Sequence, residues 1–481
     1  MIHQKQQSFV NKEPATEDVA PSSYSVQDIY HSFLSDDIHH QTAPRWRGWL
    51  EARMNDARDV PCELPADPGL LYQWIDQNID EVGERYLAYL ARRKAGGKRE
   101  MFSCRSHALN FLAEVAPTKL VDGAWLYSSL PHASDHRYAP LVQTYLEELG
   151  LGKRDQNHVA LYRKLLRQTG ADGWDVSAEG RYLQGAIQLS LGYYGADLVP
   201  EMIGFNLGYE QLPFHLHVTS YELDELGIDP YYFTVHVTVD NASTGHAKQA
   251  VEALHNLLPS DATERDPFYA RVRTGFVLND LGDSSTTVAE QFSLDGVMIE
   301  MLRRKARYGR AAHADYCKIA GRTVNDWLAH PLEIPALLTH LKSGGWILGN
   351  RDPEESRFWQ LIQGSGASMF GVFNSLEMQL VYDWIAGDCP DYLPGPTIAS
   401  EQARMVVAGQ HVAHRVQKKL VSRNGQSALA PDARASCLAL PEIEKCSLDE
   451  LIALMSPANH HSEVGLAATA RFAREAKGVM W

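Results

Sequence analysis

Apolar residues recur at every third or fourth position through most of this chain, and this helical spacing restricts its fold more than any other feature. In the segment 70–90 the pattern continues until Gly96 and Gly97, which suit a helix end. Residues 231–239, YYFTVHVTV, differ because their β-branched and aromatic side chains locally favour a strand. Strands do not alternate regularly with helices, as a parallel sheet would require. We therefore predict an all-α fold.

The length of 481 residues corresponds to two or three domains, at roughly 100–200 residues for each domain. Residues 1–42 are polar and mixed in charge, so we expect a polar N-terminal arm. A charged and polar stretch at 260–267 indicates a boundary between two helical parts. We accordingly divide the chain into the arm, a helical domain at 43–262 and a mostly helical C-terminal region at 263–481.

The balance of charged residues limits the partners of the protein. Lys and Arg number 45 against 60 Asp and Glu, which gives a net charge of −15. A protein that binds phosphates on nucleic acid or on an acidic membrane needs clustered positive charge instead. The sequence shows neither an apolar stretch typical of a membrane span nor a signal-peptide pattern. We therefore expect a cytoplasmic protein that binds neither nucleic acid nor membrane.

Carboxylates and histidines gather in three segments, of which the first is EELGLGKRDQNH at 147–158. On an unbroken helix, ten residues would rotate His158 about 80° away from Glu148. Gly150 and Gly152 can kink the path and bring the two side chains together. The alternative for this segment is a solvated helix end with charged residues.

The second segment places Glu210 in an otherwise apolar helical run. A lone carboxylate among Ile203, Phe205 and Leu207 is costly to bury unless it is paired or bound to a metal. Glu210 is therefore a candidate metal ligand.

The third segment, FTVHVTVDNASTGH, places His236 and Asp240 four residues apart, on one side of either a helix or a strand. Such a pair can chelate one cation, and His246 is a third donor within reach. The alternative is a hydrogen-bonded His–Asp pair that holds two helices together.

Together the three segments offer carboxylates and imidazoles from several helices, as in non-haem di-iron sites built inside helical bundles. Iron accepts this mixed set of oxygen and nitrogen donors. The sequence contains no G-x-S-x-G, H-E-x-x-H or G-x-x-x-x-G-K-[ST] motif, so the enzymes that use these motifs are not indicated. Asp122 and Glu114 precede the first pair and are alternatives for an extra carboxylate ligand, but we expect ordinary roles for them on helix surfaces. We expect His460 to be exposed to solvent.

The order of these residues resembles the haem-oxygenase-like di-iron oxidases, also described as iron-containing redox enzymes. The resemblance rests on ELGLGKRDQNH, a helical glutamate and H-x-x-x-D, and it covers residues 67–259. It implies a haem-oxygenase-like helical bundle with six metal ligands: Glu148, His158, Glu210, His236, Asp240 and His246. His246 is a departure, because the family's D-x-x-H would place histidine where this chain has Ser243. Either a local bulge brings His246 into place, or the second iron is held weakly.

The resemblance also implies cofactors and a class of reaction. Two Fe(II) ions per chain would use O₂ as co-substrate and an external electron donor. We expect an oxidase or oxygenase of specialised natural-product metabolism that acts on a small amine or amino-acid-derived substrate, with N-oxygenation favoured. One alternative is oxidative C–C cleavage, desaturation or decarboxylation of an amino or fatty acid by the same site. The other is a metal-free helical ligand-binding protein. The C-terminal region would cap the site, form a homodimer or contact a carrier protein.

Overall fold

The computed structural model describes residues 24–35, 46–240, 245–387 and 440–480 of the chain. Helices dominate these residues, so the prediction of an all-α fold is confirmed. The strands in the described ranges are β1 (Lys318–Ile319) and β2 (Arg322–Thr323), which pair antiparallel. None of the described helices is both long enough and apolar enough to cross a membrane.

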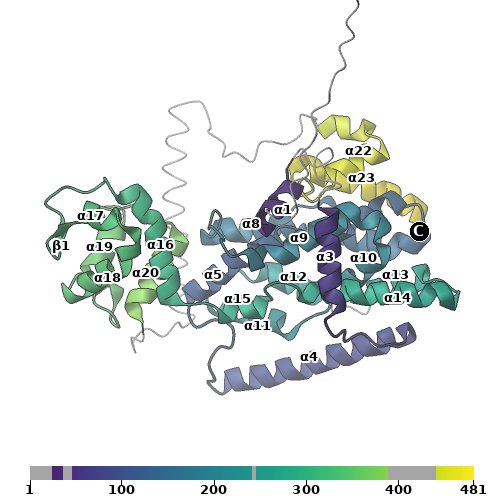
Figure 1. Cartoon of the computed structure of the whole chain (residues 1–481), viewed down its shortest axis with the longest axis horizontal. Helices are drawn as coiled ribbons and strands as arrows, with labels where there is room; N and C mark the ends of the chain where they lie inside the picture. Colours follow the sequence, from purple (N-terminus) through teal and green to yellow (C-terminus); the bar gives the residue numbers. More distant parts are fainter. Residues whose placement is uncertain (1–23, 36–45, 241–244, 388–439, 481) are drawn as a thin grey trace, which may run out of the picture.

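The larger part of the structure is a helical bundle (Figure 1). Its α-helices are α1 (Val26–Phe33), α3 (Arg47–Arg58), α4 (Leu71–Lys94), α5 (Arg105–Glu114), α6 (Ala116–Lys119), α7 (Ala139–Glu148), α8 (His158–Thr169), α9 (Glu179–Tyr194), α10 (Val199–Tyr209), α11 (Phe214–Glu225), α12 (Tyr231–Asp240), α13 (His246–Leu257), α14 (Ala262–Val277) and α15 (Ser285–Glu290). Short 3₁₀ helices connect them: η2 (Pro68–Leu70), η3 (Ala124–His132), η4 (His136–Tyr138), η5 (Gly150–Gly152), η6 (Gly195–Asp197) and η7 (Leu278–Asp280).

Close packing of α10 against α14 fixes the centre of the bundle. A Cβ atom on Gly204 would lie 1.9 Å from the carbonyl oxygen of Val272, so only glycine permits this approach. Helix α10 therefore packs closely on α14, and Glu210 is the C-terminal capping residue of α10.

A smaller helical body lies beside the bundle, at the left of Figure 1. It consists of α16 (Leu294–Gly309), α17 (Val324–Leu328), η8 (Pro331–Glu333), α18 (Ile334–Ser343), η9 (Pro353–Glu355), α19 (Arg357–Ile362) and α20 (Ser375–Ala386). These helices enclose a core of their own that includes Met298, Trp327 and Leu338. The body is joined to the bundle through α20, whose Asp383 accepts a hydrogen bond from the amide of Ser106 at 2.7 Å.

The last described residues return to the bundle as η10 (Leu440–Lys445), α22 (Leu448–Leu454) and α23 (Glu463–Met480). Ile443, Leu451 and Phe472 are buried in the same hydrophobic core as the bundle helices. Helix α23 contacts α7 and η5, and α22 contacts η3, at the upper right of Figure 1.

The segment 231–239, whose composition favours a strand, forms helix α12. Packing overrides the local preference, because Tyr232 is buried with its ring centroid 4.6 Å from that of Tyr162 on α8. The expected boundary after residue 262 coincides with the start of α14, a helix that packs into the bundle. The division into domains stays a prediction, and most of the arm at 1–42 lies outside the described residues.

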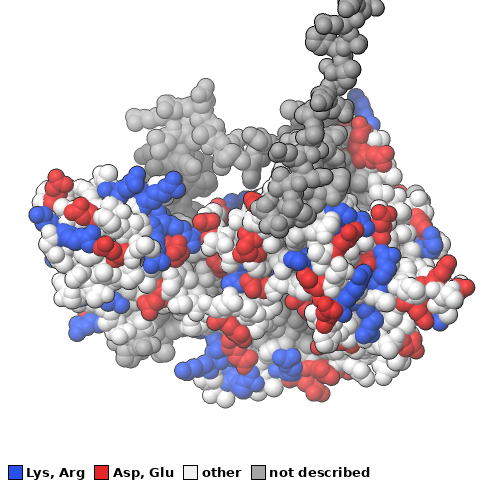
Figure 2. All heavy atoms as spheres, viewed as in Figure 1, with Lys and Arg blue, Asp and Glu red and all other residues white. Residues whose placement is uncertain are grey.

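Charged side chains of both signs are interspersed over most of the face shown in Figure 2. On the smaller helical body, at the left of this view, Lys and Arg side chains gather along the upper edge.

Candidate metal centre

Six buried carboxylates and histidines meet inside the bundle and form two groups that share one residue. In each group one donor atom per residue lies within 4.8 Å of every other. The first group comprises Asp122, Glu148, His158 and His236, and the second comprises Glu148, Glu210 and His246. Glu148 thus lies between the two groups.

The turn between α7 and α8 brings Glu148 and His158 together. Glu148 ends α7, and His158 begins α8 after Asn157, whose side chain caps the helix by accepting from the amide of Ala160 at 2.9 Å. Gly150 has a φ of +63°, and a Cβ atom there would lie 2.4 Å from the backbone nitrogen of Asn157. The tight reversal places Nδ1 of His158 2.6 Å from Oε2 of Glu148.

Asp122 is the residue that the sequence reasoning misjudged, because it is 1% exposed and not on a helix surface. The neighbouring Gly123 has a φ of +78°, and a Cβ atom there would lie 2.9 Å from Cβ of Glu148. This glycine lets the turn before η3 approach the end of α7 closely. The stretch LVDGAWL carries the missed signal, since a carboxylate in an apolar run is as costly to bury here as at Glu210.

The hydrogen bonds of His236 direct one ring nitrogen into the cluster. Its Nδ1 lies 2.7 Å from the carbonyl oxygen of Tyr232, which can only accept, so we assign the ring hydrogen to Nδ1. Its Nε2 lies 3.1 Å from Oδ2 of Asp122, and this nitrogen can bind a metal ion when it carries no hydrogen. The hydroxyl of Tyr232 donates to the same Oδ2 at 2.6 Å.

His246 is oriented in a similar way at the start of α13. Its Nε2 lies 2.9 Å from Oε2 of Glu147, and its Nδ1 lies 3.1 Å from Oε2 of Glu210 and 3.4 Å from Oε1 of Glu148. Burial raises the pKa of the Glu147 carboxyl, but the hydrogen bonds from His246 and Gln143 outweigh it and the pKa is lowered. An ionised Glu147 therefore accepts the Nε2 hydrogen and leaves the Nδ1 lone pair facing the other carboxylates.

Opposite charges hold the first group together despite its burial. Burial lowers the pKa of His158, but the charges of Glu148 and Asp122 raise it to about 9. Burial raises the pKa of Asp122, but the hydrogen bond to His236 and the nearby charges of Lys119 and the histidines hold it well below the usual range. Asp122 is thus ionised at neutral pH.

The donor set fits a divalent cation such as iron. Oδ1 of Asp122 is buried without a hydrogen-bond partner, while Oε2 of Glu148 and Nδ1 of His158 face each other at 2.6 Å. Unpaired buried polar atoms are costly, and a cation that accepts their lone pairs removes this cost. Mixed carboxylate and imidazole donors suit iron.

The sequence-predicted residues thus fall into two classes. The structure brings Glu148, His158, Glu210, His236 and His246 together, and their role as metal ligands stays a prediction. Asp240 is the last residue of α12, and its side chain lies outside the described part of the chain, as does Ser243. His460, which was expected to be exposed, is 1% exposed, so that expectation was wrong.

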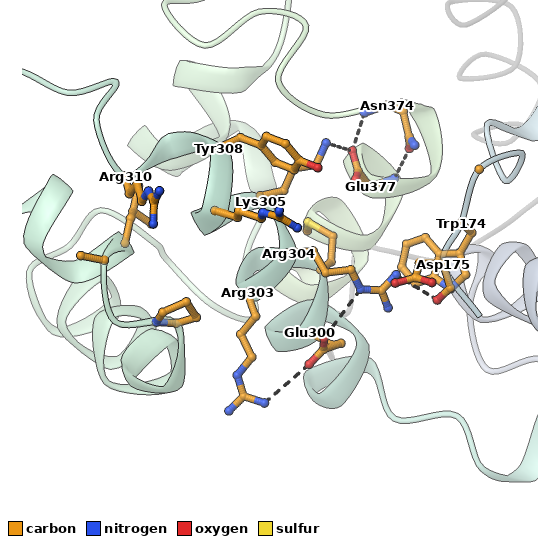
Figure 3. Close-up of a pocket in the computed structure, with 16 residues that line it drawn as sticks. Trp174, Asp175, Glu300, Arg303, Arg304, Lys305, Tyr308, Arg310, Asn374 and Glu377 are labelled. Carbon is orange, nitrogen blue, oxygen red and sulfur yellow. Dashed lines mark hydrogen bonds and ion pairs between the residues drawn. The ribbon is translucent and has the colours of Figure 1, made fainter. Parts of the chain in front are cut away.

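A separate cavity of about 650 Å³ lies where α16 faces the bundle, and none of the clustered residues lines it (Figure 3). Figure 3 shows Arg304 extending to Trp174 and Asp175, while Lys305 pairs with Glu377 at 2.8 Å. The cavity is therefore distinct from the metal cluster.

Comparison with known proteins agrees with the chemistry of the cluster. Residues 109–278 match the family described as "Iron-containing redox enzyme", and this segment contains all the residues of both groups. Searches among curated proteins and among solved structures gave no match. The predicted resemblance is therefore confirmed over residues 109–278, which are similar to the iron-containing redox enzyme family.

Proposed function

We propose that this protein is a non-haem di-iron oxidase or oxygenase that uses O₂. The position of Glu148 carries the proposal, because Oε2 faces His158 while Oε1 lies 3.4 Å from Nδ1 of His246. A carboxylate shared by two groups of donors is suited to bridge two metal ions, as in carboxylate di-iron sites of helical bundles.

Each group would hold one iron. The first would use Asp122, Glu148, His158 and His236, and the second would use Glu148, Glu210 and His246. Two ferrous ions bound there would supply electrons for the reduction of O₂, which these side chains cannot supply.

The surrounding side chains orient the donors and exclude water. Tyr232 fixes Asp122 through its hydroxyl and His236 through its carbonyl oxygen. Glu147 fixes the ring of His246 from outside the cluster. Such outer hydrogen bonds set the tautomer and the direction of a metal-binding histidine. Tyr232 and Tyr162 are buried beside the cluster and leave no room for bulk water on that side.

For the substrate we propose a small amine or amino-acid derivative that undergoes N-oxygenation in natural-product metabolism, in the cytoplasm and with an external electron donor. The support is the resemblance to the haem-oxygenase-like di-iron oxidases, from which N-oxygenation was the favoured expectation. Oxidative C–C cleavage, desaturation or decarboxylation by the same two irons is the second candidate. A homodimer and a carrier protein are further partners that we propose.

The test is turnover of iron-loaded protein with a panel of amines and amino acids in ¹⁸O₂. N-oxygenation predicts a product that carries ¹⁸O on nitrogen, and this product should disappear with Glu148→Gln. A shortened or unsaturated product without nitrogen-bound ¹⁸O would favour the second candidate. Ligand binding without iron uptake would favour the metal-free ligand-binding protein.

A further inference from the structure

The C-terminal helices lie outside the segment that matches the family, yet they contact the loop between two of the clustered residues. Helix α23 packs against η5, the glycine turn that follows Glu148. Gly152 in this turn has a φ of +84°, and a Cβ atom there would lie 2.5 Å from the carbonyl oxygen of Leu466. The loop therefore rests directly on the backbone of α23.

Asn157 connects this loop to the C-terminal helices through a fully buried side chain. Its Oδ1 accepts from the amide of Ala160 at 2.9 Å, while its Nδ2 donates to the carbonyl oxygen of Leu149 at 3.3 Å. The same Nδ2 lies 3.1 Å from Nδ1 of His460. The side-chain amide of Asn157 thus contacts three parts of the chain: Leu149 directly after Glu148, Ala160 in the first turn of α8, and His460 in the C-terminal segment.

His460 is suited to hold the amide of Asn157 in this orientation. Burial, together with the neighbouring His461 and Arg163, lowers the pKa of His460 well below its ordinary value, so the ring is neutral. A neutral ring can accept at Nδ1. If the amide were reversed, Oδ1 would face the carbonyl oxygen of Leu149 and Nδ2 would face the amide of Ala160, so both contacts would be lost.

We propose that residues 440–480 complete the metal centre and that His460 is a positioning residue for it. By fixing the amide of Asn157, His460 sets the separation of Glu148 and His158, which lie on either side of the loop. The inference rests on the proposed function only for the identity of the metal, because the geometry of the loop is present without one.

A purely stabilising role of the C-terminal helices predicts a different result, and Tyr145 provides the matched control. The hydroxyl of Tyr145, on α7, donates to the carbonyl oxygen of Met455 at 2.7 Å. Tyr145 is fully buried, and its hydroxyl bonds to Met455 of the same C-terminal region instead of to Asn157. Tyr145→Phe and His460→Leu each remove one hydrogen bond to this region, but only the second releases the amide.

The first readout needs no metal. Ala160 is the third residue of α8, and its amide donates to the Asn157 side chain and not to a carbonyl of the helix, so loss of this hydrogen bond should speed its exchange. In the full-length apo-protein we expect His460→Leu to speed exchange of this amide roughly tenfold, the effect of weakening one buried hydrogen bond. Tyr145→Phe should leave this exchange unchanged, and His460→Gln should largely restore it because its side-chain oxygen can accept from Asn157.

The second readout is anaerobic Fe(II) affinity measured by competition with a chelator. We expect His460→Leu to weaken binding about 10–100-fold, as for outer hydrogen bonds of metal ligands, with Tyr145→Phe near wild type. If His460→Leu does not fold, Asn157→Ser replaces it in the experiment. Serine still caps the helix but is too short to reach His460, so Fe(II) binding should weaken to a similar extent.

Equal effects of His460→Leu and Tyr145→Phe on Ala160 exchange would overturn the positioning role, as would wild-type Fe(II) affinity in His460→Leu and Asn157→Ser. Failure of the wild-type protein to bind Fe(II) would instead contradict the proposed function, and Ala160 exchange would still decide whether His460 positions the loop.

Discussion

Replacing Gly123 with alanine tests how closely the turn carrying Asp122 must approach Glu148. An added Cβ atom would lie 2.9 Å from Cβ of Glu148, and the φ of +78° is unfavourable for any side chain. Carbon atoms pack best at about 3.5 Å or more, so the two segments must separate by about 0.6 Å. That exceeds the roughly 0.2 Å tolerance of a metal–ligand distance, so metal binding should weaken.

Gly173 supplies the control, because its φ is +77° and nothing lies within 4 Å of its added Cβ atom. Both substitutions should lose about 1–2 kcal/mol of stability from the left-handed backbone conformation. Gly123→Ala should lose a further amount of about 1–3 kcal/mol from overpacking against Glu148.

Thermal unfolding and anaerobic Fe(II) titration measure the two effects. Each kcal/mol corresponds to a shift in Tm of about 2–4 °C for a domain of 150–250 residues. Gly123→Ala should therefore melt several degrees below Gly173→Ala and should bind iron on the order of ten times more weakly, while Gly173→Ala keeps wild-type affinity. Identical melting and identical iron affinity in the two variants would refute the reasoning.

Three further predictions follow from the same geometry. Glu148→Gln should abolish binding of both metal ions, whereas Glu210→Gln should leave the metal ion of the first group bound. Metal analysis of the purified variants measures this, and equal loss in the two variants would contradict a shared role for Glu148. Glu147→Gln should weaken metal binding about 10–100-fold at the second group, because the ring of His246 loses its ionised acceptor, and unchanged chelator competition would argue against this role. The pKa of His158 is about 9, so binding of a metal must displace a proton below that pH. The affinity for Mn(II), measured against pH, should therefore rise about tenfold per unit up to about pH 9 and then level off, whereas a flat profile would contradict the raised pKa.

The same raised pKa has a consequence for the metal-free protein. The pKa of His158 rises from 6.5 to about 9 on folding, so its contribution to stability is complete below pH 6.5 and is lost as the pH passes about 9. Chemical denaturation of apo-protein across this range should show the decline, and His158→Gln should remove it.

The helical spacing was sufficient to predict the fold class, and a glycine pair between Glu148 and His158 was sufficient to predict a kink. Glu210 was found because a single carboxylate interrupts an apolar helix. These features are local, so they can be recognised in a linear sequence. The strand-like composition of 231–239 was a weaker guide, because burial of Tyr232 against Tyr162 decides for a helix.

The features that sequence reasoning missed depend on distant contacts. Asp122 enters the cluster because Gly123 permits a close approach to Glu148, and nothing in the spacing of 26 residues between the two carboxylates indicates that contact. His460 follows Asn157 by 303 residues and still reaches its amide. His246 stayed an open choice because the path of the loop after α12 is not fixed by spacing, and the structure places its Nδ1 beside Glu210 and Glu148.

The central claim is that two irons share Glu148, and anaerobic titration of the apo-protein with Fe(II) tests it most directly. The proposal predicts about two irons per chain in the wild-type protein. It predicts that the Glu148→Gln variant binds no iron tightly. Mixing the loaded wild-type protein with O₂ should then oxidise both irons together, which Mössbauer spectroscopy would show as a coupled pair. A single iron per chain, or two irons that Glu148→Gln retains, would contradict the claim.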